Sequence, residues 1–492
     1  MKIILIFLIV FFFINPVYAD MTDYIDDYLN SYQSESYKKF SEVAKGNATI
    51  SDIEKRLLID REISDELGSN FIYLDLESCI KTALGENFDI RIRKENKNEA
   101  YWLNKNAQFS ILPDIYYNFD IRYLTGEYLV GGIVATTAHE VPIQSLAVLE
   151  WSTINQGKYF FQNSITRNAL KSQKAELEYT REEIILNTVL AYYDTLQKKM
   201  EIEVQKVNLY DRIEQLKYTK ARFDSGLGTL YDVKRAQAEL AGAQQDYTTT
   251  LNSLRLNQAA LANIMGVDIL DAIYPFEISV DRRVLVDPSF DIEALYNQAL
   301  KSREDIRSKK AEISMYRAMR NMNYTDIIPE ITFSYQNGLV GTRRVGLSSH
   351  NSVTLDVRAH LGKNMLLGTI TQMKADTAVL RAKKLELINL QRTVKENILN
   401  AFYDSENAIK KIEASKSETE AANHSVELSL ANMKAGEATF IDVIASQNLK
   451  VKANINLITN MIEYNKAQSK LLFEIGLISI DSVLKDYQKK YY

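Results

Sequence analysis

Residues 222–233 read RFDSGLGTLYDV, and residues 432–443, 210 positions later, read NMKAGEATFIDV. Both stretches hold a glycine, a threonine three residues on, and an aspartate–valine pair that begins three residues beyond the threonine. Glycine often ends a helix in the left-handed backbone region, and threonine followed three positions later by an acidic residue is a capping box that starts a helix. Each stretch therefore predicts a sharp turn between two helices, and the chain has two such turns.

The similarity between the two halves extends beyond the turns. At a spacing of 216 residues, Asp89-Ile90-Arg91 matches Asp305-Ile306-Arg307, and Pro113 matches Pro329. Self-similarity at a fixed spacing marks a repeated structural unit. The predicted parts of the chain are a signal peptide at 1–19, an acidic N-terminal extension at 20–70, a first repeat at 71–274, a linker at 275–287, a second repeat at 288–480 and a C-terminal tail at 481–492.

Each repeat is predicted to start with one helix, capped by Asp75 or Asp291, that ends before Pro113 or Pro329 because the residue before proline avoids the α region. After each proline, apolar and polar residues alternate, which is typical of a strand with one apolar face. A glycine-rich loop and a returning strand follow, so one chain supplies four strands. The polar positions predicted to line a wet pore are Asn118, Asp120, Arg122, Asp356 and Arg358.

Four strands cannot close a barrel, and open strand edges cannot face lipid. A membrane barrel built from these strands must therefore be shared between chains. The rest of each repeat predicts long helices, from about Lys171 to Phe223 and from Thr229 to Ile264 in the first. Val233, Leu240, Tyr247, Leu254 and Leu261 lie seven residues apart. Sustained heptads indicate coiled-coil packing between neighbouring helices.

The N-terminus carries the marks of export. A lysine precedes an apolar run from Ile3 to Ile14, and Val17-Tyr18-Ala19 supplies small residues before a cleavage point at Asp20, so we predict a signal peptide. Residues 20–70 hold twelve acidic and six basic residues in a chain of net charge −5. A solvated polar extension is the favoured interpretation of this stretch, and an acidic binding site is the alternative.

No sequence pattern indicates catalysis or a cofactor. Cys79 is the only cysteine, so an intrachain disulfide is excluded, and its apolar neighbours favour a buried side chain over a reactive thiol. The four histidines are scattered, and we assign no metal site. Phosphate-binding loops, nucleophile elbows and paired-carboxylate motifs are not apparent, and no basic stripe indicates nucleic acid. We expect no enzyme and no cofactor.

The doubled order of these motifs resembles the TolC family of outer-membrane efflux proteins over about residues 71–480. The resemblance implies a mainly α fold with a small β part: a homotrimer with a shared twelve-stranded barrel in the outer membrane and a long coiled-coil helical barrel in the periplasm. It also implies a passive exit channel of a tripartite efflux pump or a type I secretion system in a Gram-negative-type cell. The implied partners are outer-membrane lipid, a periplasmic adaptor protein and an inner-membrane transporter of the RND, ABC or MFS type.

The resemblance also assigns roles to the two turns. It places Asp232 and Asp442 at a periplasmic gate, although capping the following helix explains both residues equally well. The residues that it places at adaptor-docking tips are Gly226, Thr229, Gly436 and Thr439. Gly226 and Gly436 have the simpler interpretation of helix C-caps. Where the best-known member of the family has tyrosine, arginine and a second aspartate, this chain has Met433, Ala438 and Ala445, so the closing network must differ.

One alternative from another class stays open at this stage. A periplasmic coiled-coil structural or adaptor protein without a pore explains the heptads and the signal peptide, but not four amphipathic strands placed after two matched prolines. The sequence does not identify the exported substrate.

Overall fold

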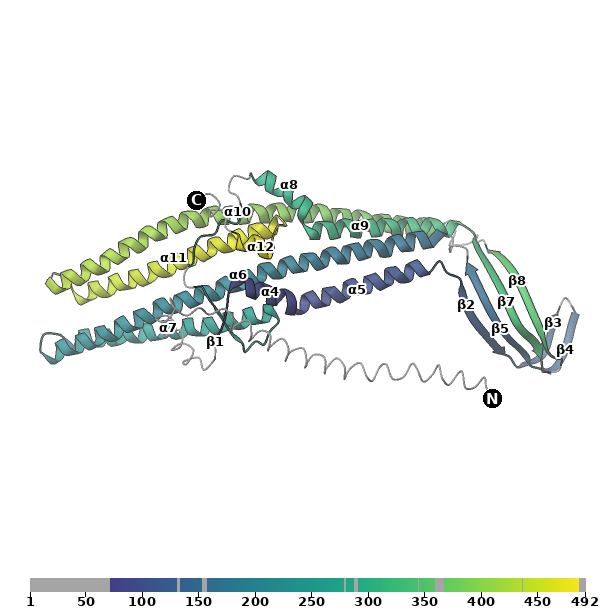
Figure 1. Ribbon diagram of the computed structural model, residues 1–492, viewed down its shortest axis with the longest axis horizontal. Helices are drawn as coiled ribbons and strands as arrows, with labels where there is room; N and C mark the ends of the chain where they lie inside the picture. Colours follow the sequence, from purple (N-terminus) through teal and green to yellow (C-terminus); the bar gives the residue numbers. More distant parts are fainter. Residues whose placement is uncertain are drawn as a thin grey trace. The chain divides into compact units, whose positions relative to one another are not determined.

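The computed structural model describes residues 71–130, 133–152, 157–277, 280–286, 291–343, 345–358, 367–435 and 437–485 (Figure 1). The predicted signal peptide, the acidic extension, Gly436 and the end of the predicted tail lie outside the described residues. The described chain divides into two compact units. Unit 1 takes residues 71–91, 180–303 and 394–485, and unit 2 takes residues 92–179 and 304–393.

The first long helix of the chain is longer than the sequence predicted, and the second matches its predicted bounds to within one residue. Helix α6 (Lys158–Asp224) and helix α10 (Thr369–Ala435) have 67 residues each, about 100 Å at 1.5 Å per residue. Helix α7 (Leu230–Met265) follows α6, and α11 (Phe440–Glu474) follows α10. The prediction started the first helix at Lys171, 13 residues after its start in the structure.

The predicted heptads of α7 pack within the first repeat of unit 1. Tyr247 and Leu254 from α7 form a buried cluster with Ile202 of α6 and Tyr274. In the second repeat, Ala408 and Ile412 of α10 form the corresponding cluster with Tyr464 of α11. Each pair of long helices is therefore joined by an apolar seam, as the seven-residue spacing predicted.

The prediction of one helix before each proline is wrong in one respect, because each helix is broken in two. The first repeat has α4 (Leu76–Glu86) and α5 (Phe88–Phe109), separated by Asn87, and the second has α8 (Ile292–Ser302) and α9 (Glu304–Met322), separated by Arg303. Their N-caps are as predicted, since Asp75 accepts from the Ser78 N–H and Asp291 from the Ile292 N–H.

The break residues tie the short helices to the ends of α7 and α11. The Asn87 side chain donates to the Ile264 carbonyl at 2.7 Å, and Arg303 donates to the Glu474 carbonyl at 3.0 Å. These side chains satisfy carbonyls that a helix end leaves without intrahelical partners. In both repeats, therefore, a side chain at the helix break bonds a carbonyl at the end of the second long helix. The first repeat uses an amide and the second a guanidinium.

A glycine beside each break explains the close approach. Gly266 lies at φ +73°, and a Cβ on it would meet the Glu86 carbonyl oxygen at 2.5 Å. Gly476 lies at φ +68°, and its Cβ would meet the Arg303 backbone nitrogen at 2.9 Å. Only glycine fits both the left-handed backbone and the contact.

Unit 1 also contains a small parallel sheet. Strand β1 (Phe71–Leu74) pairs with β6 (Ala272–Pro275), so the first and last segments of the first repeat lie side by side. The buried Lys199 ammonium of α6 donates to the Pro275 carbonyl at 2.8 Å and lies 4.5 Å from the ring centroid of Tyr274. A buried ammonium needs such partners, and here they hold β6 against α6.

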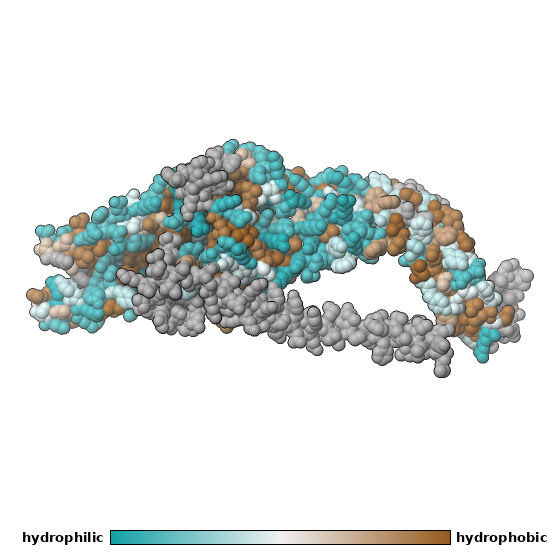
Figure 2. Space-filling view, in the orientation of Figure 1, coloured by the Kyte–Doolittle hydropathy of each residue, from teal (hydrophilic) through white to brown (hydrophobic). Residues whose placement is uncertain are grey.

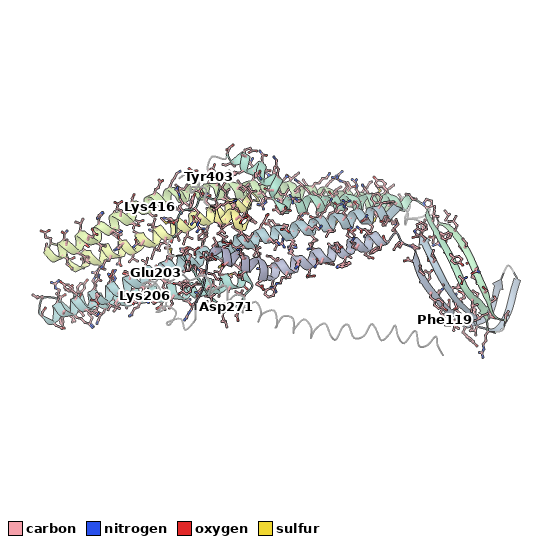
Figure 3. All side chains as sticks on the ribbon, in the orientation of Figure 1. Phe119, Glu203, Lys206, Asp271, Tyr403 and Lys416 are labelled. Carbon is pink, nitrogen blue, oxygen red and sulfur yellow. The ribbon has the colours of Figure 1, made fainter. Side chains whose placement is uncertain are left out.

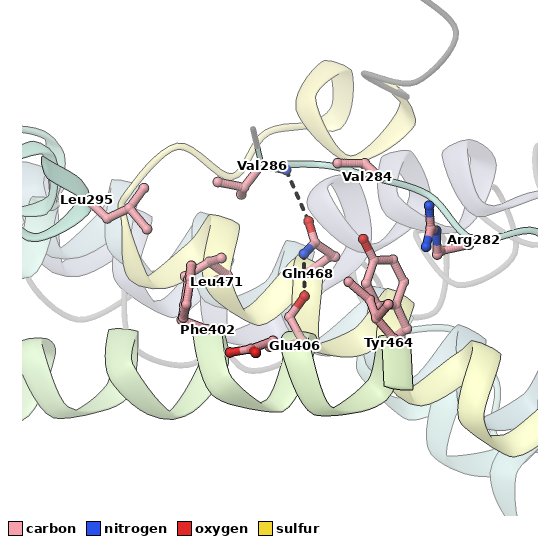
Figure 4. A pocket seen from close by; sticks show the side chains of 11 residues that line it. Arg282, Val284, Val286, Leu295, Phe402, Glu406, Tyr464, Gln468 and Leu471 are labelled. Atoms are coloured by element: carbon pink, nitrogen blue, oxygen red, sulfur yellow. Dashed lines mark hydrogen bonds between the residues drawn. The ribbon is translucent and has the colours of Figure 1, made fainter. Parts of the chain in front are cut away.

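The chain that follows β6 is held by two polar residues of α11. Asn465 accepts from the Arg283 N–H at 3.0 Å and donates to the Asp281 carbonyl at 2.9 Å. Gln468 accepts from the Val286 N–H at 3.1 Å (Figure 4) and from the Leu285 N–H at the same distance. Asn465 interrupts the heptad of α11, and its bonds to this extended segment give the reason. A cavity of about 300 Å³ beside the segment is lined by residues that include Val284, Leu295 and Tyr464.

Four strands of unit 2 form an antiparallel sheet in the order β2-β5-β7-β8. They are β2 (Asp114–Ile121), β5 (Pro142–Ser152), β7 (Glu330–Thr342) and β8 (Gly346–Arg358). A 3-10 helix, η2 (Asn323–Ile327), leads into β7. Unit 1 ends with the short helix α12 (Ile480–Leu484), capped by Ser479.

The predicted glycine-rich loop of the first hairpin is wrong in part. It contains a second hairpin of β3 (Leu124–Val130) and β4 (Ile133–Glu140). Pro142 opens β5 instead of lying in a loop, and proline is tolerated as the first residue of a strand. The apolar residues of 124–140 sit among glycines and threonines, so the turn signals outweighed the alternation in the sequence.

Candidate functional site

The register of the four-stranded sheet separates its two faces by residue number. Asn118 lies opposite Leu146, which lies opposite Gly338, which lies opposite His350. Since opposed residues in antiparallel strands point to the same face, even-numbered residues of all four strands share one face. The odd-numbered residues share the other.

All five residues predicted to line a pore belong to the even-numbered face. Asn118 and Asp120 lie on β2, and Asp356 and Arg358 lie on β8. Arg122 extends the ladder past β2, because its N–H donates to the Pro142 carbonyl at 3.1 Å. The structure thus places these residues on one face of the sheet, as the alternation predicted.

Both arginines of this face pair with aspartates. Arg122 lies 2.5 Å from Asp120 at one end of the sheet, and Arg358 lies 2.5 Å from Asp356 at the other. Near the Asp356 end, the Tyr116 hydroxyl donates to Glu150 at 2.9 Å. Leu146 and Val148 are buried between these ends, and the sequence did not reveal them because β5 was the less regular strand.

The odd-numbered face is apolar and exposed. Ile115 on β2 is 75% exposed, and Val353 on β8 is 67% exposed. Figure 2 shows hydrophobic residues gathered over these strands, and Figure 3 labels Phe119 among them. Soluble monomers rarely expose an apolar surface of this extent. At the end near β2's first residue, the Trp151 indole donates to the Ile111 carbonyl at 3.2 Å, and such amphipathic aromatics are typical of a membrane interface.

The turn between α6 and α7 has the predicted caps. Gly226 lies at φ +76°, and the Leu227 N–H closes the helix end on the Arg222 carbonyl at 2.9 Å. The Thr229 hydroxyl accepts from the Asp232 N–H, and the Asp232 carboxylate accepts from the Thr229 N–H at 3.1 Å. The prediction of a C-cap glycine and a capping box is confirmed for this turn.

The second turn repeats the capping box. Asp442 accepts from the Thr439 N–H at 2.8 Å and from its hydroxyl at 2.6 Å. These bonds lower the pKa of Asp442 below its ordinary value, so this carboxylate is charged. Gly436 lies outside the described residues. The N–H groups of Glu437 and Ala438 both donate to the Asn432 carbonyl, which ends α10.

The two turns share no hydrogen bond among their described residues. Asp232 and Asp442 each bond within their own turn, so the structure gives both a capping role. Met433, Ala438 and Ala445, which stand where the resemblance led us to expect closing contacts, cannot form an ion pair. The contacts between the repeats lie farther along the helices.

A polar seam joins α6 of the first repeat to α11 of the second, and reasoning from the sequence missed it. Arg212 on α6 is 2% exposed; it donates to the Asn448 side chain at 2.7 Å and to the Gln447 side chain at 3.2 Å. Burial lowers the pKa of its guanidinium. Farther along, Gln197 donates to Thr459 at 3.1 Å, and Lys466 pairs with Asp194.

The polar seam and the apolar clusters differ in the free energy needed to separate the helices that they join. Parting α6 from α7, or α10 from α11, would expose buried aromatic and aliphatic side chains at about 25 cal/mol per Å². Parting α6 from α11 exposes polar groups that water can satisfy. The seam between repeats is therefore the weaker of the two kinds of contact.

Other functional groups are not apparent in the part of the chain that the structure describes. No three histidine, cysteine, aspartate or glutamate side chains gather there as a metal site would require. None of the described helices has a stretch long and apolar enough to cross a membrane.

A sheet with one polar and one apolar exposed face, continued by long paired helices in tandem repeats, defines the class of outer-membrane channels. The family model described as "Outer membrane efflux protein" matches residues 162–267 and 295–476. The match covers more than half of the chain, which therefore belongs to this family.

Individual relatives agree with the family. The chain is 25% identical over 328 residues to "Outer membrane protein TolC" of Vibrio cholerae, covering 64% of this chain and 73% of that protein. It is 22% identical over 341 residues to "Outer membrane efflux protein BepC" of Brucella suis, covering 67% and 73%. Its fold resembles that of the CmeC outer membrane channel of Campylobacter jejuni, with a TM-score of 0.73 at 14% identity, over 85% of this chain and 88% of that one.

The chain is thus an outer-membrane channel of efflux systems with a large periplasmic part, and its family is one of passive channels. The alternative of a periplasmic protein without a pore is not favoured. The predictions of family, fold class, function and location are confirmed.

Proposed function

We propose that three copies of this chain form one exit duct, with a shared twelve-stranded barrel in the outer membrane and a helical barrel in the periplasm. The observation that carries this proposal is the pair of open edges of the sheet, because β2 and β8 each have one neighbour among the described strands. Each unpaired backbone group in hydrocarbon costs several kcal/mol. Pairing β8 of one copy with β2 of the next removes both edges.

The odd-numbered face fits the outside of such a barrel, and the even-numbered face fits its interior. Asn118, Asp120, Arg122, Asp356 and Arg358 then line the pore. The aspartates Asp120 and Asp356 pair with arginines. Asp114, Glu150 and Glu330 add three further carboxylates to the same face, so this part of the pore carries a net negative charge. A duct of this kind conducts by diffusion and needs no chemical step.

The tips of the helix pairs are the proposed docking points for a periplasmic adaptor, which would connect the duct to an inner-membrane transporter of the RND, ABC or MFS type. Such an assembly is a tripartite efflux pump or a type I secretion system. The docking residues are Gly226, Thr229, Gly436 and Thr439. Their neighbours Leu227 and Tyr231 are 72% and 64% exposed, and exposed apolar side chains of this size are typical of binding surfaces.

The gate is proposed to lie at the same end, where three copies of Asp442 form a ring of charge that favours cations, with Asp232 helping to hold the entrance closed. Since this chain has Met433, Ala438 and Ala445 nearby, the buried Arg212 seam supplies closing contacts. Breaking that seam lets the two helix pairs part while each stays intact.

Cysteine pairs test the shared barrel. Asn118→Cys on β2 is combined in turn with Ser348→Cys, His350→Cys or Ser352→Cys on β8, all on the even-numbered face. Oxidation of outer-membrane preparations should give covalent dimers and trimers for at least one pair. Purely monomeric chains in all three cases would contradict the barrel.

Planar-bilayer recordings test the gate. Asp442→Ala should lower the cation preference of the open channel, because it removes a charged ring. Thr439→Ala is the matched control, since it removes the hydroxyl of the same cap and keeps the carboxylate. Equal selectivity in wild type and Asp442→Ala would mean that Asp442 only caps its helix.

A further inference from the structure

Positive charge is concentrated in the helices of unit 2. Residues 92–109, 158–179, 304–322 and 369–393 hold 18 lysines or arginines against nine aspartates or glutamates, a net of +9. The long helices of unit 1, at 180–224, 230–265, 394–435 and 440–474, hold 20 basic and 21 acidic residues. The whole chain has a net charge of −5, so this basic region is a local feature.

The basic region contains a groove between α6 and α9. The groove has a volume of about 460 Å³, and Lys171 and Lys174 from α6 face Arg307 and Lys310 from α9 across it. All four side chains are exposed. A hydrogen bond of 2.8 Å between the hydroxyls of Ser172 and Ser308 holds the helices together beside it.

The groove has more positive charge than its own acids neutralise. Its two glutamates are Glu178 and Glu304, and Arg307 pairs with Glu304 at 2.5 Å. Among the described residues, the ammonium groups of Lys171, Lys174 and Lys310 make no hydrogen bond or ion pair. Three unpaired cations around one groove favour an anionic occupant.

The same chain supplies an acidic segment that fits. Residues 20–37 hold five acidic residues and no basic one. Tyr24, Tyr28 and Tyr32 recur every four residues among these acids, and a tyrosine ring adds about 0.5–1 kcal/mol when it lies over an exposed cation. The lysine-lined groove therefore suits this segment through opposite charge and through cation–π contacts with its tyrosine rings.

The tether is long enough for the segment to reach the groove. The 33 residues between Tyr37 and Phe71 span up to about 110 Å at about 3.3 Å per residue. That reach is comparable to the length of α6, about 100 Å for 67 residues. Reach therefore does not restrict the segment to the neighbourhood of β1.

We propose that the acidic segment 20–37 binds the groove formed by Lys171, Lys174, Arg307 and Lys310, on its own chain or on a neighbouring copy. This role goes beyond the proposed function of the duct and does not depend on it. The binding is electrostatic, so it weakens as the Debye length falls from about 10 Å at 0.1 M salt to about 3 Å at 1 M.

Photo-crosslinking of the full mature protein tests the proposal. With Tyr28→p-benzoylphenylalanine, illumination should join residue 28 to peptides from 168–178 or 304–314, identified by mass spectrometry. Crosslinks within one chain and between copies both support the groove. Crosslinks confined to other parts of the protein, or none at all, would overturn it.

Charge reversal makes the test specific. Lys171→Glu with Lys310→Glu should lower the crosslink yield at least tenfold, and adding Asp26→Lys with Asp27→Lys should restore it. Lys416→Glu, on an exposed lysine of α10 in unit 1 (Figure 3), is the matched control and should leave the yield unchanged. Unchanged helical circular dichroism shows that each variant has folded.

A competing occupant has a distinct signature. If the groove serves a soluble polyanion, heparin will protect Lys171 and Lys310 from acetylation in the full protein, and deletion of residues 20–37 will leave the acetylation of these lysines unchanged. That result would refute the proposal. Faster acetylation on deletion of 20–37, reversed by adding the 20–37 peptide, would support it.

Discussion

Glu277 makes the stability of unit 1 depend on pH. Its carboxyl group follows β6, where burial raises its pKa from 4.5 to about 7; Arg283 opposes the shift and Asp75 adds to it. The Oε2 atom is buried without a hydrogen-bond partner among the described residues. Burial disfavours the charged form, so this glutamate is more stable as the neutral acid in the folded protein.

The sign and size of the effect follow from linkage. Between pH 4.5 and 7 the folded state holds a proton that the unfolded state releases, so the free energy of unfolding falls as pH rises through this window. At 1.36 kcal/mol per pKa unit, the free energy of unfolding is lower above pH 7 than at pH 4.5 by at most about 3 kcal/mol. Glu277→Gln, which stays neutral, should therefore be more stable than wild type at pH 8 and similar to it at pH 4.5.

Thermal unfolding followed by helical circular dichroism measures the effect. On the order of 2 °C per kcal/mol for a large chain, the Tm of Glu277→Gln should exceed that of wild type by about 5 °C at pH 8. Glu413→Gln, an exposed glutamate of α10, is the control and should follow wild type at every pH. Parallel Tm–pH curves for Glu277→Gln and wild type would refute the reasoning.

Three further predictions concern contacts between helices. Gly266→Ala should destabilise the protein by at least about 2 kcal/mol, because its φ of +73° and its 2.5 Å approach to a carbonyl both exclude a Cβ. Gly242→Ala, in open space on α7, is the control and should stabilise the protein by up to about 1 kcal/mol. Equal Tm values for the two variants would contradict this prediction. Glu474→Gln should cost about 3 kcal/mol in chemical unfolding by leaving Arg303 buried without its carboxylate partner, and a change below about 1 kcal/mol would show the pair to be solvated. Arg212→Met should raise the resting conductance of reconstituted channels, and Lys220→Met on the same helix is the control. Unchanged conductance of Arg212→Met would show that the seam does not help to close the gate.

The sheet was largely predictable because its rule is local. Apolar and polar residues alternate along a strand that has one lipid-facing and one wet face, so Asn118 and Asp356 could be assigned to the same face before the register was known. Proline at 113 and 329 fixed where the strands start. The hairpin at 124–140 was missed because its glycines and threonines carry turn signals as strong as its alternation.

The contacts between distant segments could not be predicted. The break at Asn87 exists because that side chain reaches the end of α7, 177 residues away. No residue near Asn87 in the sequence indicates this contact. No local pattern marks Arg212 as buried, and only the approach of α11 makes it a buried partner of Asn448. Asn465 lies seven residues after Ile458 and seven before Leu472, but its partners, the backbone at Asp281 and Arg283, are 184 and 182 residues away in the sequence.

Conductance of the purified mature protein in a planar lipid bilayer tests the central claim most directly. An outer-membrane channel should insert as trimers and give uniform stepwise currents that persist without any energy source. Bilayers that contain verified trimers and yet stay at baseline conductance, after conditions that open related channels and with Arg212→Met as well, would contradict it.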